Sequence, residues 1–188
     1  MLAAIQEIDE RVLRAARTWG HTPRVERAVG RFSRLGEHGA VWLAIGLAGG
    51  ALDGARRERW RRGVASVALA YGLNTATKAL VRRRRPELPG LPALTSTPTR
   101  LSFPSAHAAT SFAGARAYSR AGAPALPLYA LAVSLSLSRL YLGVHYPGDV
   151  LAGAALGSAV AARPCVPHAS PRDPRCALGS DSVLERRA

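Results

Sequence analysis

The sequence predicts an all-α protein: an integral membrane bundle of about five core helices, preceded by an amphipathic helix. Four segments carry no charged residue, small residues recur four positions apart within them, and strand signals are absent. A soluble helical protein is the alternative, because most of the apolar segments fall short of the roughly 20 residues that span a bilayer.

The N-terminal element is an amphipathic helix over residues 2–20, where apolar side chains recur at helical spacing among three arginines. Such a helix lies either on a membrane surface or against a soluble core, and the segment alone favours neither. We therefore treat residues 1–34 as an amphipathic helix and its connector.

The apolar segments predict the core helices, which together form one membrane domain over residues 35–162. Because these segments are apolar on all sides, each must be surrounded by lipid or protein. Arginines at their ends can lengthen a short span by reaching the interface, and we interpret Arg82–Arg84 as a membrane-flanking cluster of this kind. The expected helices cover residues 39–52, 63–80, 104–118, 123–141 and 148–162.

Charge and cysteine content narrow the functional classes. The 188 residues carry a net charge of +14, which suits nucleic acid, an anionic membrane surface or an anionic substrate. Both cysteines, Cys165 and Cys176, lie in a stretch over 163–188 that is rich in proline, serine and charge, which predicts a disordered polar tail. Whether they pair is open. No Cys/His spacing suggests a metal site, so we expect neither metal nor cofactor.

Three short clusters between the apolar segments hold the residues from which we expect chemistry. If the five helices alternate in direction, the end of the second, the start of the third, the end of the fourth and the start of the fifth meet on one face of the bundle. The clusters would then be neighbours in space. Their residues are Lys78, Arg85, Ser105, Ala106, His107, Ser138, Arg139, His145 and Asp149.

Each residue type in the clusters suits a phosphate group. Ser105 is a favourable N-cap, and the free N–H groups of the following turn attract an anion. Asp149 can accept a hydrogen bond from one ring nitrogen of His145 and leave the other free as a nucleophile. Arginines offer paired donors to phosphate oxygens, and Lys78, the only lysine, adds a point charge. Each residue alone also has a structural interpretation, so the prediction rests on the set.

The three clusters resemble the signatures of the type 2 phosphatidic acid phosphatase superfamily, KxxxxxxRP, PSGH and SRxxxxxHxxxD. The first and third match in full at 78–86 and 138–149, whereas Ala106 replaces the glycine of the second. The added methyl group should cost little, since the backbone N–H is kept. The resemblance implies a multi-pass membrane enzyme that hydrolyses a lipid-linked phosphate monoester without metal, through a phosphohistidine.

The resemblance also implies the role of each residue. His145 would be the nucleophile, His107 the general acid and then base, and Asp149 the group that orients His145. The implied phosphate-binding residues are Lys78, Arg85, Ser105, Ala106 and Arg139.

The stretches RFSRLGEHGAVWL and TPTRLSFPSAHA resemble more specifically the small actinobacterial phosphatases of decaprenylphosphoryl phosphoribose, which act in cell-wall synthesis. A polyprenyl diphosphate or phosphatidylglycerophosphate is the alternative substrate. A non-catalytic protein that binds anionic lipid is a second alternative, and a soluble nucleic-acid binder a third. The expected partners are a lipid-linked phosphate and membrane lipid, not nucleic acid. Oligomeric state stays open, and so does orientation, because the expected loop at 56–62 carries five arginines and the N-terminal segment seven.

Overall fold

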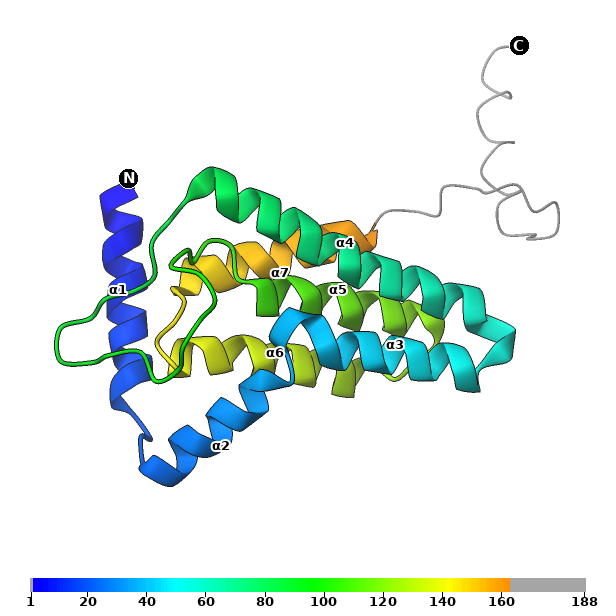
Figure 1. The fold of residues 1–188 in the computed structure, drawn as a ribbon, viewed down its shortest axis with the longest axis horizontal. Helices are drawn as coiled ribbons and strands as arrows, with labels where there is room; N and C mark the ends of the chain where they lie inside the picture. Colours follow the sequence, from blue (N-terminus) through cyan, green and yellow to red (C-terminus); the bar gives the residue numbers. More distant parts are fainter. Residues whose placement is uncertain (1, 163–188) are drawn as a thin grey trace, which may run out of the picture.

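The computed structural model describes residues 2–162, which form an all-helical bundle (Figure 1). Within that range the only strand-like pairings are two isolated bridges, so the predicted all-α class is confirmed. The predictions for the tail, Cys165 and Cys176 included, lie outside the described residues. The helices are α1 (Leu2–Thr18), α2 (Pro23–Arg34), α3 (Ala40–Leu52), α4 (Arg57–Val81), α5 (Ala106–Ala121), α6 (Ala125–Tyr141) and α7 (Pro147–Ala162), with short 3-10 turns at Glu37–Gly39 and Gly54–Arg56.

Helix α5 lies at the centre of the bundle and packs against α4, α6 and α7. Small residues allow the closest of these approaches. A Cβ added to Gly157 would lie 2.0 Å from the Ala109 carbonyl oxygen, and one added to Gly153 would lie 2.4 Å from that of Ser105. The spacing of glycines in the sequence therefore does mark a helix contact, as expected for small residues four positions apart.

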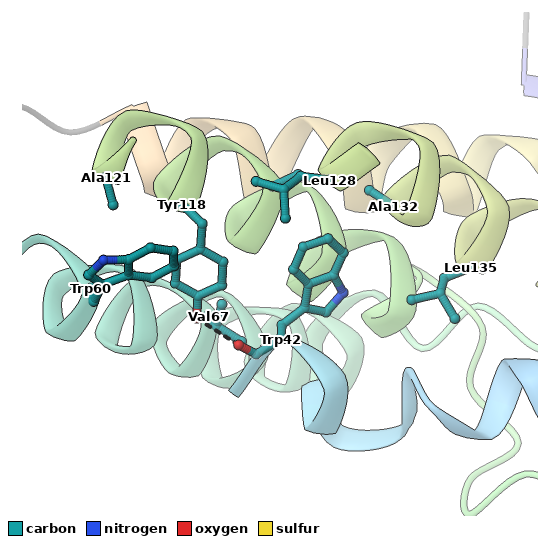
Figure 2. Close-up of a cluster of buried hydrophobic side chains, with 9 residues drawn as sticks. Trp42, Trp60, Val67, Tyr118, Ala121, Leu128, Ala132 and Leu135 are labelled. Carbon is teal, nitrogen blue, oxygen red and sulfur yellow. Dashed lines mark hydrogen bonds between the residues drawn. The ribbon is translucent and has the colours of Figure 1, made fainter. Parts of the chain in front are cut away.

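An aromatic cluster joins α3, α4 and α5 within the core (Figure 2). The rings of Trp60 and Tyr118 stack with centroids 5.3 Å apart, and the Tyr118 hydroxyl donates to the Trp42 carbonyl at 2.8 Å. The Trp42 indole N–H donates in turn to Ser111 Oγ at 2.9 Å. The polar tips of Tyr118 and Trp42 are thus satisfied, so these two side chains can be buried without an unpaired donor.

Two helices differ from the sequence-based expectation. The predicted connector contains α2, which begins where Thr22 accepts a hydrogen bond from Val25 N and Pro23 occupies the first turn. The prediction of a loop at 56–62 was wrong, because most of that segment is the first part of α4. The segment is rich in charge, which favoured a loop, but it also contains Trp60. This side chain is buried against Tyr118, and the contact holds the first turns of α4 on the bundle.

One helix among the described residues, Gly54–Val81, is long and apolar enough to cross a membrane. Helices α6 and α7 are apolar but shorter. The segment 82–105 leaves the end of α4, runs past α1 and returns to the start of α5, so it covers one end of the bundle (Figure 1).

Candidate active site

The predicted residues meet at the end of the bundle that α1 and the segment 82–105 cover (Figure 1). The end of α4, the start of α5, the end of α6 and the start of α7 all lie there, as the alternating directions predicted. Ser105, His107, Arg139, His145 and Asp149 are buried, with at most 8% of any of them exposed. This burial removes competing water from the charges of the site.

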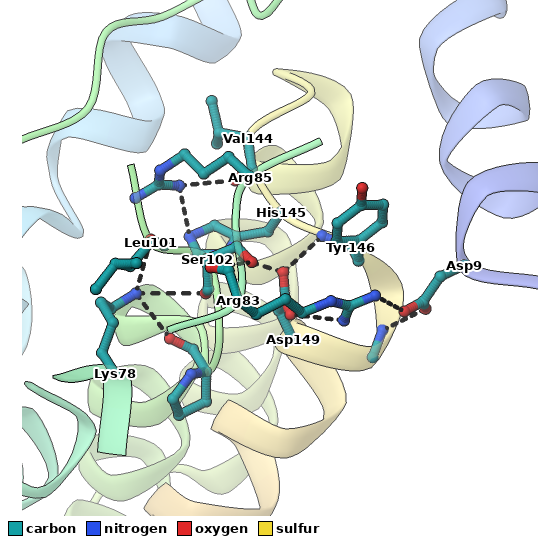
Figure 3. A network of polar contacts seen from close by, with 12 residues as sticks. Asp9, Lys78, Arg83, Arg85, Leu101, Ser102, Val144, His145, Tyr146 and Asp149 are labelled. Atoms are coloured by element: carbon teal, nitrogen blue, oxygen red, sulfur yellow. Dashed lines mark hydrogen bonds and ion pairs between the residues drawn. The ribbon is translucent and has the colours of Figure 1, made fainter. Parts of the chain in front are cut away.

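His145 lies between an arginine and a carboxylate (Figure 3). Its Nε2 lies 3.2 Å from Nη1 of Arg85, which can only donate, so Nε2 is the unprotonated nitrogen. The ring proton is then on Nδ1, which faces Asp149 Oδ2 at 3.5 Å. That distance makes the contact electrostatic rather than a hydrogen bond, and Nδ1 has no hydrogen-bond partner.

The surroundings of His145 keep its ring neutral. Burial lowers the pKa of His145 to about 3; the neighbouring Asp149 opposes the shift, and the cations Arg85, Arg139 and Lys78 reinforce it. Burial also lowers the pKa of Arg85, to about 10, which still leaves this side chain cationic at neutral pH. A neutral imidazole with its lone pair beside a guanidinium can act as a nucleophile toward an anion bound at that guanidinium.

Asp149 is held by a network that the sequence analysis missed (Figure 3). Its Oδ2 accepts from Tyr146 N at 2.9 Å, and its Oδ1 accepts from Arg83 Nη1 at 2.9 Å. Arg83 also donates through Nη2 to Asp9 Oδ2 on α1 at 2.8 Å, and its guanidinium carbon lies 4.1 Å from the centre of the Tyr146 ring. Asp9 in turn accepts from Gly148 N at 2.7 Å.

The interpretation of Arg82–Arg84 as a membrane-flanking cluster was therefore wrong for Arg83. Arg82 ends α4 in a left-handed conformation (φ 55°), which turns the chain, and Arg84 forms a backbone bridge with Leu101. The side chains of Arg82 and Arg84 are exposed, whereas Arg83 turns inward between two carboxylates. Nothing in the run of arginines distinguishes the middle one, because its partners are 66 and 74 positions away.

The last turn of α2 enters the site through Ser33, which the sequence analysis did not single out. His107 Nε2 donates to the Ser33 carbonyl at 2.9 Å, because a carbonyl oxygen can only accept. The Ser33 hydroxyl accepts from Arg139 Nη1 at 2.7 Å and from Ser138 Oγ at 3.0 Å. Ser33 thus connects His107 to the arginine of the third cluster. The only sequence signal was its place in the stretch RFSRLGEHGAVWL.

Lys78, an expected phosphate ligand, contacts backbone carbonyls in this structure. Lys78 Nζ donates to three carbonyls, those of Leu101, Ser102 and Pro104, at 3.3, 3.3 and 3.0 Å. Asn74, one turn earlier, donates to the Pro104 carbonyl at 3.1 Å and so bridges the two segments.

Ser105 occupies the N-cap of α5, but its hydroxyl caps no backbone N–H, so the predicted side-chain cap was wrong. Its Oγ is buried with no partner in the structure and is free to donate to a bound anion. Ala106 follows as the first residue of α5, where the backbone N–H groups of the first turn have no helical acceptor.

The arrangement can bind a tetrahedral dianion and attack it. Arg85, Arg139 and the start of α5 supply positive charge and donors, while His145 supplies an unprotonated nitrogen. His107, in the first turn of α5, supplies a second imidazole that can serve as an acid or a base. Within residues 2–162, no group of three or more metal-binding side chains is found.

Comparison with known proteins matches this arrangement to a family. The sequence profile of the PAP2 superfamily matches residues 61–167, more than half of the chain. The chain belongs to the PAP2 superfamily. The resemblance read from its three clusters is thereby confirmed.

Characterised relatives support the same membership. The chain is 42% identical over 130 residues to the decaprenylphosphoryl-5-phosphoribose phosphatase of Mycobacterium tuberculosis, covering 69% of this chain and 73% of the relative. It is 42% identical over 132 residues to the phosphatase of the same name from Mycolicibacterium smegmatis, covering 70% and 72%. The predicted enzyme class, a phosphoric monoester hydrolase, is confirmed.

Two solved structures share the fold. LpxE from Aquifex aeolicus superposes with a TM-score of 0.68 at 24% identity, covering 80% of this chain and 90% of LpxE. The transmembrane PAP2-type phosphatidylglycerolphosphate phosphatase from Bacillus subtilis superposes with a TM-score of 0.67 at 24% identity, covering 84% and 83%. The helical arrangement is thus shared with LpxE and with another PAP2-type protein.

Proposed function

We propose that this PAP2 phosphatase hydrolyses the phosphate monoester of a lipid-linked sugar phosphate, with decaprenylphosphoryl-5-phosphoribose as its substrate. The substrate follows from the two mycobacterial relatives, which carry that name at 42% identity. The chemistry rests on one observation above all: a buried, neutral His145 whose free Nε2 lies 3.2 Å from Arg85.

In the proposed reaction, His145 Nε2 attacks phosphorus in line and the bond from phosphorus to the sugar oxygen breaks. Protonated His107 gives its proton to that departing oxygen, so the sugar leaves as an alcohol. Water then attacks the phosphohistidine while His107 takes one of its protons, which releases inorganic phosphate and restores both rings. Asp149 keeps the Nδ1–H tautomer of His145 throughout.

The charge that develops on the phosphoryl oxygens is stabilised by the remaining residues of the site. Arg85 and Arg139 offer guanidinium donors, Ser105 offers its unpartnered hydroxyl, and the backbone N–H groups from Ala106 onward point to the anion. Lys78 adds positive charge and holds the 101–104 carbonyls in place.

We further propose that residues 35–162 form an integral, multi-pass membrane domain. Large apolar side chains point outward on several helices, among them Leu47 (65% exposed), Leu126 (82%) and Leu151 (70%). A lipid surrounding would cover these side chains, and the transmembrane relative from Bacillus subtilis shares the fold. On α1, Asp9 and Leu13 are buried, and Trp19, the residue after the helix, is 80% exposed, which suits a helix at the membrane surface that also packs on the bundle.

The test is a comparison of substrates with the purified protein in detergent and excess EDTA. A prenylphosphoryl ribose 5-phosphate should release phosphate faster than a prenyl diphosphate, phosphatidic acid or phosphatidylglycerophosphate. His145→Ala should abolish release, and label from the transferred phosphoryl group should appear on histidine in the wild type only. His38→Asn, a change at an exposed histidine with positive φ, is the control and should keep full activity. Full activity of His145→Ala would refute the mechanism.

A further inference from the structure

A polar cavity lies beside the active site, between α2 and the segment 82–105. Its volume is about 730 Å³, within the range of ligand-binding sites. Arg27, Arg31 and Arg34 line it from α2, and Leu94 and Thr95 line it from the opposite side. The three arginines are four and three positions apart, so they share one face of the helix.

This cavity is cationic because its arginines have no acidic partner. No carboxylate within residues 2–162 forms an ion pair with Arg27, Arg31 or Arg34. Arg27 donates to its own helix at the Pro23 carbonyl. Glu26, the single acid on the wall, contacts His21 Nδ1 at 3.1 Å instead. The guanidinium groups are thus available to an anion.

Two walls of the cavity are attached directly to the active site. Arg34 follows Ser33, whose carbonyl accepts from His107 and whose hydroxyl accepts from Arg139. On the other side, Leu94 N donates to the carbonyl of Leu142, three residues before His145. The cavity therefore adjoins the residues that hold the His107 ring, which protonates the departing oxygen in the proposed mechanism, and a group attached to that oxygen can extend toward α2.

The proposed substrate carries two phosphates, one at each end of a pentose. The monoester reacts, and the diester joins the sugar to the prenyl chain. Resting on the proposed function, we propose that the cavity lined by Arg27, Arg31 and Arg34 binds the non-reacting phosphodiester of the substrate. Recognition of this second charge would make the enzyme specific for lipid-linked sugar phosphates over lipids with a single phosphate, because binding energy far from the reacting bond positions that bond.

The test uses the double variant Arg31→Gln/Arg34→Gln and two synthetic substrates. One is a prenylphosphoryl ribose 5-phosphate; the other is an alkyl riboside 5-phosphate with a chain of equal length and no diester. The variant should lose about 10- to 100-fold in kcat/KM on the first substrate, mainly through KM, and less than about twofold on the second. Arg24→Gln, an exposed arginine of α2 outside the cavity, is the matched control. Equal melting temperatures establish that all variants are folded.

The outcomes separate this inference from the proposed function. No turnover of the two-phosphate substrate by the wild-type enzyme would refute the proposed function. Wild-type turnover with equal losses on both substrates, or no loss on either, would overturn the cavity proposal alone. Repeating the assay in neutral detergent and in phosphatidylglycerol bicelles distinguishes the source of the anion. A loss that appears only with the anionic lipid would assign the arginines to headgroup binding and overturn the proposal.

Discussion

Replacing Arg83 by glutamine tests whether the reacting histidine depends on the N-terminal helix. The guanidinium joins Asp149 of α7 to Asp9 of α1, at 2.9 and 2.8 Å. Burial alone would lower the pKa of Arg83. The hydrogen bonds and negative charges of Asp9 and Asp149 outweigh burial, so the pKa of Arg83 is raised. In the Arg83→Gln variant, two carboxylates that are 5% and 0% exposed would lose their cation together.

The size of the effect follows from those contacts. Breaking a buried ion pair costs 3–5 kcal/mol, and the 23% exposure of the Arg83 side chain places this case near the lower end, at about 3 kcal/mol. For a domain of this size, that loss lowers the melting temperature by roughly 6–12 °C. Because Asp149 orients His145 in the proposed mechanism, kcat should fall by about 10- to 100-fold, the range seen when outer-shell partners of metal ligands are removed. KM should change little, since Arg83 does not contact the substrate.

The assay is phosphate release at saturating and limiting substrate, at a temperature where every variant is folded. Arg84→Gln is the matched control, because its side chain is exposed and its known contacts are through the backbone. Asp9→Asn should reproduce part of the kcat loss from a position on another helix. A variant Arg83→Gln that melts early yet keeps wild-type kcat would show that the network only stabilises the fold and would refute the reasoning.

Three further predictions concern single residues. The pKa of His145 is about 3 in the native protein against 6.5 when unfolded, so between these values only the unfolded state binds the proton and stability falls as pH falls. By pH 4 the free energy of unfolding of the wild type should fall by about 3 kcal/mol, whereas that of His145→Asn should lack this fall. The measurement is the melting temperature of both proteins across pH. Gly157→Val should separate α7 from α5 and prevent folding, since the new Cβ would lie 2.0 Å from the Ala109 oxygen; a folded variant by size-exclusion chromatography would contradict this. Ala106→Gly, which restores the glycine of the family signature, should change kcat/KM by no more than about threefold, because both residues present the same N–H.

Much of the site could be predicted from sequence because it sits at helix ends. The expected helices at 123–141 and 148–162 end within two residues of α6 and α7, and alternating directions alone bring His107, Arg139 and His145 together. These features are local: they follow from runs of apolar residues and from the residues at their ends.

The contacts made by Arg83 and Ser33 could not be predicted in this way. Arg83 reaches Asp9 across 74 positions, and Ser33 meets Arg139 across 106. Arg82 and Arg84, the neighbours of Arg83, have the same side chain. Only the turn at Arg82 and the bridge of Arg84 to Leu101 therefore decide which arginine points inward. Contacts of this kind depend on how separate elements pack, and no local pattern encodes them.

Taken together, these contacts change the part assigned to residues 1–34. Helix α1 supplies Asp9 to the network behind His145, the proposed nucleophile, and α2 supplies Ser33 to the ring that would protonate the leaving group. Each of the two histidines is therefore supported from the N-terminal segment, through elements that the core helices do not contain. A bundle lacking that segment would keep His107 and His145 but would lose Ser33, a direct partner of His107, and Asp9, which acts on His145 only through Arg83 and Asp149. The N-terminal helices are thus part of the active-site architecture, and we expect removal of residues 1–34 to reduce kcat even where the remaining helices still fold.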